Sequence, residues 1–191
     1  MESSDFDFDR PILGLFYSRP GVQLFIGRGA KGAAGGVGDM ELVDTSINVF
    51  GMASPFSGGR DSGLEVIFPY GLHSGFRRLT IRDGSTSSDT FEATVIAIGA
   101  GAGLQRGIGA TRFLVRAMPA FGLASRSFGF GNGTSTLVDI DAELTFGPIA
   151  GRLGLALGYQ YRWQKWKMEE DFVDDRDYSG TQHGFRLGVF W

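Results

Sequence analysis

Residues 150–166 alternate between two unlike faces along their whole length, and this alternation constrains the fold more than any other feature of the chain. One face carries large apolar side chains, namely Leu153, Leu155, Leu157, Tyr159, Tyr161 and Trp163. The other face carries small or polar residues, namely Arg152, Gly154, Ala156, Gly158, Gln160 and Arg162. A period of two predicts a β-strand with two faces. The apolar face changes from aliphatic to aromatic, an order that suits hydrocarbon followed by a lipid headgroup region.

The last seven residues repeat the alternation and end on an aromatic side chain. Phe185, Leu187, Val189 and Trp191 alternate with Arg186, Gly188 and Phe190. Such a closing strand resembles the final strand of small bacterial outer-membrane β-barrels. The resemblance implies an eight-stranded antiparallel barrel in the bacterial outer membrane, assembled by the barrel-insertion machinery. Functions of such barrels range over anchoring, adhesion, passage of small solutes and lipid modification, and the fold does not choose among them.

The rest of the chain predicts further strands of the same kind. The eight expected strands are 11–29, 37–52, 62–82, 89–101, 107–123, 134–147, 150–166 and 181–191. Pro20–Gly21 and Pro69 are interpreted as bulges, because proline lacks a donor for the strand ladder. Splitting 11–29 and 62–82 instead gives ten strands. Either even number predicts an all-β, closed, up-and-down transmembrane barrel over 11–191, in which 11–29 lies beside 181–191.

This topology places both termini in the periplasm, with 1–10 as a periplasmic tail. The expected outer connections are 29–38, 83–89, 125–134 and 165–180, and the expected inner connections are 53–61, 101–107 and 147–151. The N-terminus has neither the basic start nor the apolar run of a secretory signal, so the barrel hypothesis expects that a signal has been removed. No apolar run of about 18 residues is present, which excludes a transmembrane helix.

Composition fits a narrow barrel without proving one. The chain of 191 residues has 31 glycines, a net charge of -3 and no cysteine. Small side chains suit a crowded lumen, and the absence of cysteine excludes disulfides and thiolate metal sites. Net acidity without a basic stripe argues against nucleic acid.

Charges of both signs fall on the small-residue faces and are expected to neutralise one another inside the barrel. The predicted lumen network contains Glu92, Arg112, Arg116, Asp139, Asp141, Glu143, Arg152, Arg162 and Arg186. Eight strands enclose a space that side chains just fill, so a structural plug is expected rather than a wide pore. The predicted lipid-facing and girdle residues are Leu153, Leu155, Leu157, Tyr159, Tyr161, Trp163, Phe185 and Trp191.

A second cationic group is expected at the outer rim of the barrel. It contains Arg28, Lys31, Arg77, Arg78 and Arg82. Arginine suits phosphate recognition through paired N–H donors, so lipopolysaccharide phosphates are the expected partners, beside membrane lipid. Scattered solubilising charges are the alternative interpretation.

Other candidate sites are weaker, and we predict no catalytic residue, metal or cofactor. His73 and Ser74 are adjacent and therefore point to opposite faces of a strand. Acidic residues crowd 169–177, but their spacing matches no EF-hand loop and favours a solvated loop. The glycine-rich runs 29–38 and 99–103 lack the ending of a phosphate-binding loop.

The leading hypothesis is a monomeric, non-enzymatic outer-membrane barrel with a plugged polar lumen and outer loops that bind or shield. The alternatives are a narrow channel for small solutes, a lipid-modifying enzyme of the outer membrane, and a soluble lipocalin-like barrel that binds a ligand. The membrane and soluble hypotheses differ in which face points inward: polar residues inside for the first, apolar residues inside for the second.

Overall fold

The chain forms a single antiparallel sheet in an all-β fold. The computed structural model describes residues 8, 10–19, 21–32, 38–57, 63–83, 87–125, 133–150, 153–170 and 173–190. Within these ranges there are ten strands: β1 (Leu13–Arg19), β2 (Val22–Lys31), β3 (Asp39–Ser57), β4 (Leu64–Asp83), β5 (Ser87–Ala100), β6 (Ala102–Ile108), β7 (Thr111–Ser125), β8 (Gly133–Ala150), β9 (Leu153–Glu170) and β10 (Val173–Phe190). No helix of the described ranges is long and apolar enough to cross a membrane.

Neighbouring strands in the sequence are neighbours in the sheet, so the chain is a meander. The order runs from β1 to β10, with β6 pairing with β4 and β7. The pairings of β4, β5, β7 and β6 therefore close on themselves as a ring of four strands. The register of β5 against β4 continues unchanged into β6, and so does the register against β7. β5 and β6 therefore occupy one strand position in the sheet, interrupted at Gly101.

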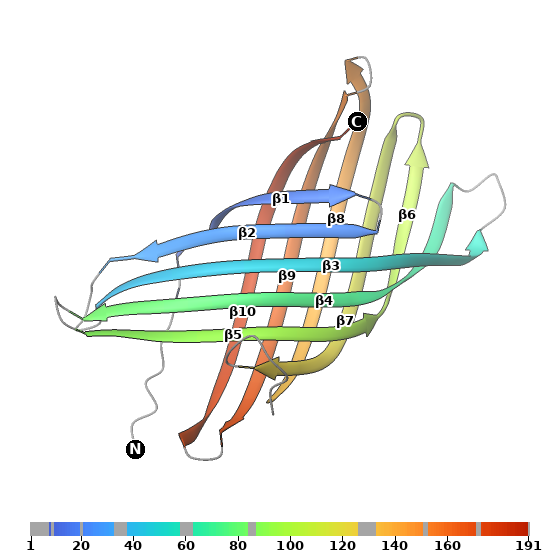
Figure 1. Ribbon diagram of the computed structural model, residues 1–191. Helices are drawn as coiled ribbons and strands as arrows, with labels where there is room; N and C mark the ends of the chain where they lie inside the picture. Colours follow the sequence, from blue (N-terminus) through green and yellow to red (C-terminus); the bar gives the residue numbers. More distant parts are fainter. Residues whose placement is uncertain are drawn as a thin grey trace.

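The sheet bends sharply where β5 ends and β6 begins. Figure 1 shows β1–β5 as one layer, and β7–β10 as a second layer whose strands cross the first, while β6 already runs with the second. At the corner, Gly101 donates a backbone hydrogen bond to the carbonyl of Pro69, 2.8 Å away. A Cβ at Gly101 would overlap the carbonyl oxygen of Ala117, so only glycine lets these backbones approach so closely.

The two ends of the sheet differ in their connections. We call the end with the β2–β3, β4–β5, β7–β8 and β9–β10 connections end A, and the opposite end, with the β1–β2, β3–β4, β6–β7 and β8–β9 connections, end B. β1 begins at end A, where Leu13 pairs with Arg28, whereas β10 finishes at end B, where Phe190 pairs with Gly154. The first strand thus begins and the last strand finishes at opposite ends of the sheet, so the expectation that both termini lie on one side is wrong for the part of the chain that the structure describes.

The predicted strand 11–29 is wrong as a single strand, and this error explains the termini. The chain reverses between Arg19 and Val22, which pair with each other, so 11–29 forms the hairpin of β1 and β2. Gly21 has a φ of 84°, a turn conformation that glycine adopts at little cost. A turn at Gly21 therefore stands where a bulge was expected.

Segment 62–82 does form one long strand, as predicted, and Pro69 lies within it. The bulge is in its partner β3, where the register shifts between Ala53 and Phe56. The prediction of eight strands is wrong. The alternative of ten has the right number, but the second division falls at Gly101 and not within 62–82.

Three predicted connections are strands in the structure. Segment 101–107 falls largely in β6, and the reversal comes at 109–110, beside Gly109 with its φ of 58°. Segment 165–180 is largely a hairpin, because β9 extends to Glu170 and β10 begins at Val173. Segment 147–151 continues β8 as far as Ala150, with a shift in register after Phe146. Glycines and charges suggested loops there, although the ladder continues through them.

β1 and β10 are the two edges of the sheet, and no ladder joins them within the described ranges. They meet through side chains, since the Arg186 guanidinium lies 4.3 Å from the centre of the Phe16 ring. The expectation that the first and last strands pair and close the barrel is therefore wrong for the described residues, where 11–29 and 181–191 are neighbours through side-chain packing. We call the gap between these two edges the seam.

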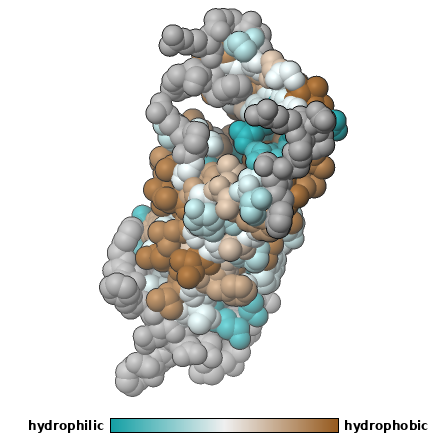
Figure 2. All heavy atoms as spheres, turned by 90° about the vertical axis from the view of Figure 1, so that its right-hand side faces the viewer, coloured by the Kyte–Doolittle hydropathy of each residue, from teal (hydrophilic) through white to brown (hydrophobic). Residues whose placement is uncertain are grey.

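The sheet places polar side chains inside and apolar side chains outside. Its buried polar residues are Gln23, Asp44, Ser46, Asn48, His73, Arg77, Arg116, Ser135, Asp139, Asp141, Arg162 and Gln164. A smaller apolar cluster, including Ala93, Val95, Leu137 and Trp166, fills the interior beside them. Large apolar side chains stand exposed on the outer face of most strands, and Figure 2 shows them as a band across the middle of one side.

We predict that Gly101→Val prevents correct folding, because its side chain would meet the backbone of β7 at the corner. Gly107→Val is the matched control, because a Cβ at Gly107 meets nothing within 4 Å. The measurement is the folded yield of each variant in detergent, with β-structure followed by circular dichroism. Equal yields for the two variants would show that the corner does not depend on Gly101.

Candidate functional site

A ladder of arginine–aspartate pairs occupies the interior of the sheet. Each pair joins residues directly opposite each other on neighbouring strands: Asp44 with Arg77, Asp139 with Arg162, and Asp141 with Arg116. The alternation of each strand turns both members inward, where opposite charges on facing positions attract. We call these three pairs, together with Arg186, the arginine network.

The pair nearest end A lies among aromatic rings. Arg77 Nη2 donates to Asp44 Oδ2 over 2.7 Å, and to the Gln182 side-chain oxygen over 3.3 Å. Arg77 also donates to the Tyr178 hydroxyl, and its guanidinium lies 5.7 Å from the Trp166 ring centre. Arg77 of β4 thereby contacts β10 on the other side of the interior.

The middle pair joins the same two layers. Arg162 donates to Asp139 over 3.1 Å and to the Ser46 hydroxyl over 3.3 Å. The Gln160 amide donates to the same aspartate over 2.9 Å. These charges are almost fully buried, so hydrogen bonds to several partners are what makes their burial tolerable.

In the third pair, one carboxylate is shared between two arginines. Asp141 accepts from Arg116 over 2.9 Å and from Arg186 over 2.7 Å. Arg186 crosses Gly158 to reach it, and a Cβ at Gly158 would lie 3.0 Å from Arg186 Nε. Arg116 also donates to Gln23 over 2.9 Å, which connects β7 to β2 across the interior.

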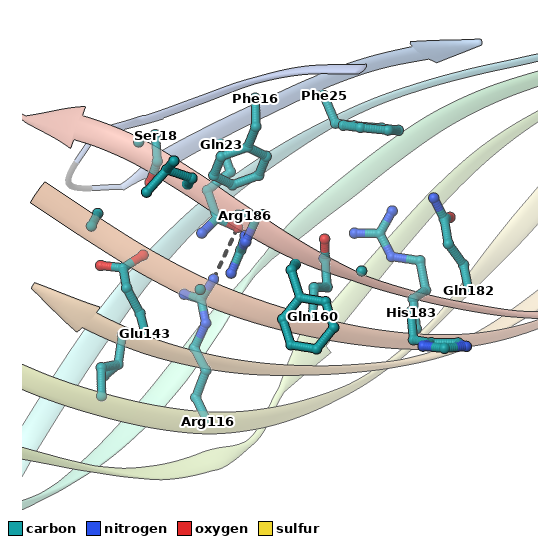
Figure 3. A pocket seen from close by; sticks show the side chains of 18 of the residues that line it. Phe16, Ser18, Gln23, Phe25, Arg116, Glu143, Gln160, Gln182, His183 and Arg186 are labelled. Atoms are coloured by element: carbon teal, nitrogen blue, oxygen red, sulfur yellow. Dashed lines mark hydrogen bonds between the residues drawn. The ribbon is translucent and has the colours of Figure 1, made fainter. Parts of the chain in front are cut away.

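A cavity of about 1750 Å³ runs beside the network along the seam. Figure 3 shows Phe16 and Phe25 on one side of it, with Arg116, Glu143, Gln160 and Arg186 on the strands opposite. Gly184 and Gly188 also line the cavity, and a Cβ at either would meet nothing within 4 Å. The interior is thus crossed by the network but hollow near β10.

Most predicted lumen residues come together, with one clear exception. Arg116, Asp139, Asp141, Arg162 and Arg186 form the network, and Arg112 and Glu143 line the cavity. Glu92 instead points outward, in phase with Ile96 and Ile98, and pairs with Arg78. Both faces of its segment carry apolar residues, so the sequence did not distinguish inside from outside there. Arg152 lies outside the described residues.

The predicted cationic rim divides between the two faces. Arg28, Arg78 and Arg82 are exposed on the outer surface near end A, where Glu41 pairs with Arg28 and Arg82. Arg77 is buried in the network, so its assignment to the rim is wrong. Lys31 ends β2 and is half-buried, in phase with the inward Gln23. Adjacent residues such as Arg77 and Arg78 must point to opposite faces.

The predicted lipid-facing residues lie on the outer face. Leu153, Leu155 and Leu157 are exposed, and Phe185 is 88% exposed at the edge strand. The aromatic members Tyr159, Tyr161 and Trp163 continue the same face and are half-buried among neighbours. Trp191 lies outside the described residues.

Sequence reasoning missed several interior residues. It assigned no role to Asp44, Gln23, Gln164 or Trp166, and it placed Tyr178 on the adhesive surface of an expected outer loop. A signal was present for Asp44, because Asp44, Ser46 and Asn48 alternate with apolar residues. For Tyr178 there was none, since it lay within an expected loop.

The remaining candidates do not form a reactive site. His73 is buried, with its Nδ1 2.6 Å from Asn48 Oδ1, while Ser74 lies on the opposite face. No group of three or more potential metal ligands occurs within the described ranges. The acidic segment 169–177 falls in the β9–β10 hairpin, and the structure does not describe its acidic side chains.

Comparison with protein-family models, with curated proteins and with solved structures gives no match to this chain.

We predict that Asp139→Leu lowers the free energy of unfolding by about 3–5 kcal/mol, because it leaves Arg162 charged and buried without its partner. Adding Arg162→Met should recover most of that loss. Glu41→Gln, in the exposed Arg28 pair, is the control and should cost less than about 1 kcal/mol. Equilibrium unfolding in urea measures all three, and a double variant no more stable than Asp139→Leu would contradict the pairing.

Proposed function

We propose that this chain is an integral β-barrel protein of the bacterial outer membrane, with a polar interior closed by the arginine network and a structural or surface-binding role. The observation that carries the proposal is the reversed distribution of side chains. Buried positions include arginine, aspartate, glutamine and asparagine beside apolar residues such as Leu42, Ile67 and Leu137, whereas many leucines, isoleucines and phenylalanines stand exposed. A water-soluble ligand-binding barrel would have the opposite arrangement.

The dimensions of the apolar face support the same proposal. On β9 the outward side chains from Leu153 to Trp163 are all large and apolar, and charge begins at Lys165. That interval matches the roughly 9–11 residues with which a tilted strand crosses hydrocarbon. Tyr161 and Trp163 end it, in the position of an interfacial girdle.

The outer charges near end A support an outward orientation of that end. Arg28, Arg78 and Arg82 lie on the outer face beyond the apolar band and could contact lipopolysaccharide phosphates through paired N–H donors. Glu41 and Glu92 lie among them and bind these arginines. Such a mixed belt also fits headgroups bridged by divalent cations, so lipopolysaccharide is the proposed neighbour.

The first experiment tests the membrane environment directly. We expect Leu155→Arg to lower folding stability in lipid vesicles by about 2–4 kcal/mol, because a cation at mid-bilayer on the lipid face is costly. Ala30→Arg is the matched control: Ala30 is also exposed on the outer face, but it lies opposite Glu41 near end A. Equal effects of the two variants on vesicle-folded yield would argue that Leu155 does not meet lipid.

The second experiment separates a plugged barrel from a channel. Because the three pairs of the arginine network cross the interior, we expect no steady single-channel steps from the folded protein in planar bilayers. The folded state is verified by a change in gel mobility on boiling. Steady steps from such a sample would support the narrow-channel alternative instead.

A further inference from the structure

The cavity at the seam is lined by Arg186, one guanidinium nitrogen of which is a buried donor that no described residue satisfies. Arg186 is 14% exposed in its side chain, and its Nη2 donates to Asp141. Its Nη1 is fully buried and has no hydrogen-bond partner within the described ranges. A buried guanidinium nitrogen without an acceptor is costly, so an acceptor at this position would stabilise the site.

Charge in the same place is incompletely neutralised. Asp141 is shared by Arg116 and Arg186, whereas Arg77 and Arg162 have an aspartate each. Among the described residues that line the cavity, the charged side chains are seven arginines and two glutamates. The cavity therefore favours an anion.

The lining of the cavity is also apolar, and in particular aromatic. Phe16, Phe25 and Phe50 contribute to it. The guanidinium of Arg186 lies 4.3 Å from the Phe16 ring centre, and that of Arg116 lies 4.1 Å from the Phe50 ring centre. Rings and arginines together suit a ligand with an apolar body and a charged head.

The seam gives this cavity a lateral opening. Consecutive residues 14–16 of β1 and 184–189 of β10 line it, so it includes both faces of each edge strand and reaches past the edges. On the outer side the edge strands present Leu13, Leu15, Phe185 and Leu187, each more than three-quarters exposed. In a membrane these side chains would lie in hydrocarbon, so an apolar chain could enter there without meeting water.

We propose that the cavity behind the seam binds a single-chain anionic amphiphile, whose head group accepts hydrogen bonds from Arg186 while its chain lies along the phenylalanines toward the opening. This inference rests on the proposed membrane location for its route of entry. It also supplies an occupant for a seam that backbone pairing does not close.

The test is calorimetric titration of laurate into the folded protein in neutral maltoside micelles. Dodecyltrimethylammonium, with the same chain and the opposite charge, and acetate, with the head group alone, are the comparison probes. We expect saturable binding of laurate only. Arg186→Gln should weaken it at least tenfold, because a charge-assisted hydrogen bond is lost, and Arg186→Lys should retain part of the affinity.

Gly184→Phe provides an independent variant, because it fills the hollow beside β10 without touching the network. We expect it to fold normally and to abolish laurate binding. Leu157→Phe introduces the same side chain on the outward face of β9 and should leave binding unchanged. Absence of saturable laurate binding, or equal binding by wild type and Gly184→Phe, would overturn the inference.

The two proposals fail in different ways. A protein that needs detergent and shifts on boiling but does not bind laurate would overturn the cavity inference alone. A protein that stays monomeric without detergent and still binds laurate through Arg186 would overturn the membrane location and leave the site in place.

Discussion

The structure depends on charges that are paired within a sheet-enclosed interior. Arg77, Arg116 and Arg162 each face an aspartate on the neighbouring strand, and each of these pairs also reaches the opposite side of the fold, through Tyr178, Gln23 or Ser46. Burial of any one of these charges alone would be strongly unfavourable. Their mutual satisfaction makes a polar core possible, and a polar core leaves the apolar residues to the outside.

The corner at Gly101 is what turns a long meander into an enclosure. Without it, β1–β5 and β7–β10 would form one open sheet, and the arginines of one layer could not meet the acceptors of the other. The same bend brings the two edge strands toward each other, where Arg186 packs against Phe16. The cavity and the seam are consequences of this one change of direction.

Much of the fold could be predicted from alternation alone. The all-β class, the two faces of β9, the outward position of Leu155 and the inward position of Asp139 and Arg162 all follow from a period of two. The errors arose at glycines, because a glycine can mark either a turn or a place where two backbones approach closely. The turn at Gly21 was expected to be a bulge, while Gly101 and Gly103 permit close approaches of neighbouring backbones within a segment that was expected to form a connection. Sequence patterns do not show which neighbour a backbone will approach.

The sequence by itself determined which residues share a face, because the geometry of an extended chain admits only two sides. It could not determine that Arg77 crosses to Tyr178, that Asp141 serves two arginines, or that Arg186 keeps an unsatisfied nitrogen beside a cavity. Those contacts join residues from 25 to 101 positions apart in the chain. Only the tertiary structure decided them, because they depend on how far the sheet bends and on where its two edges stop.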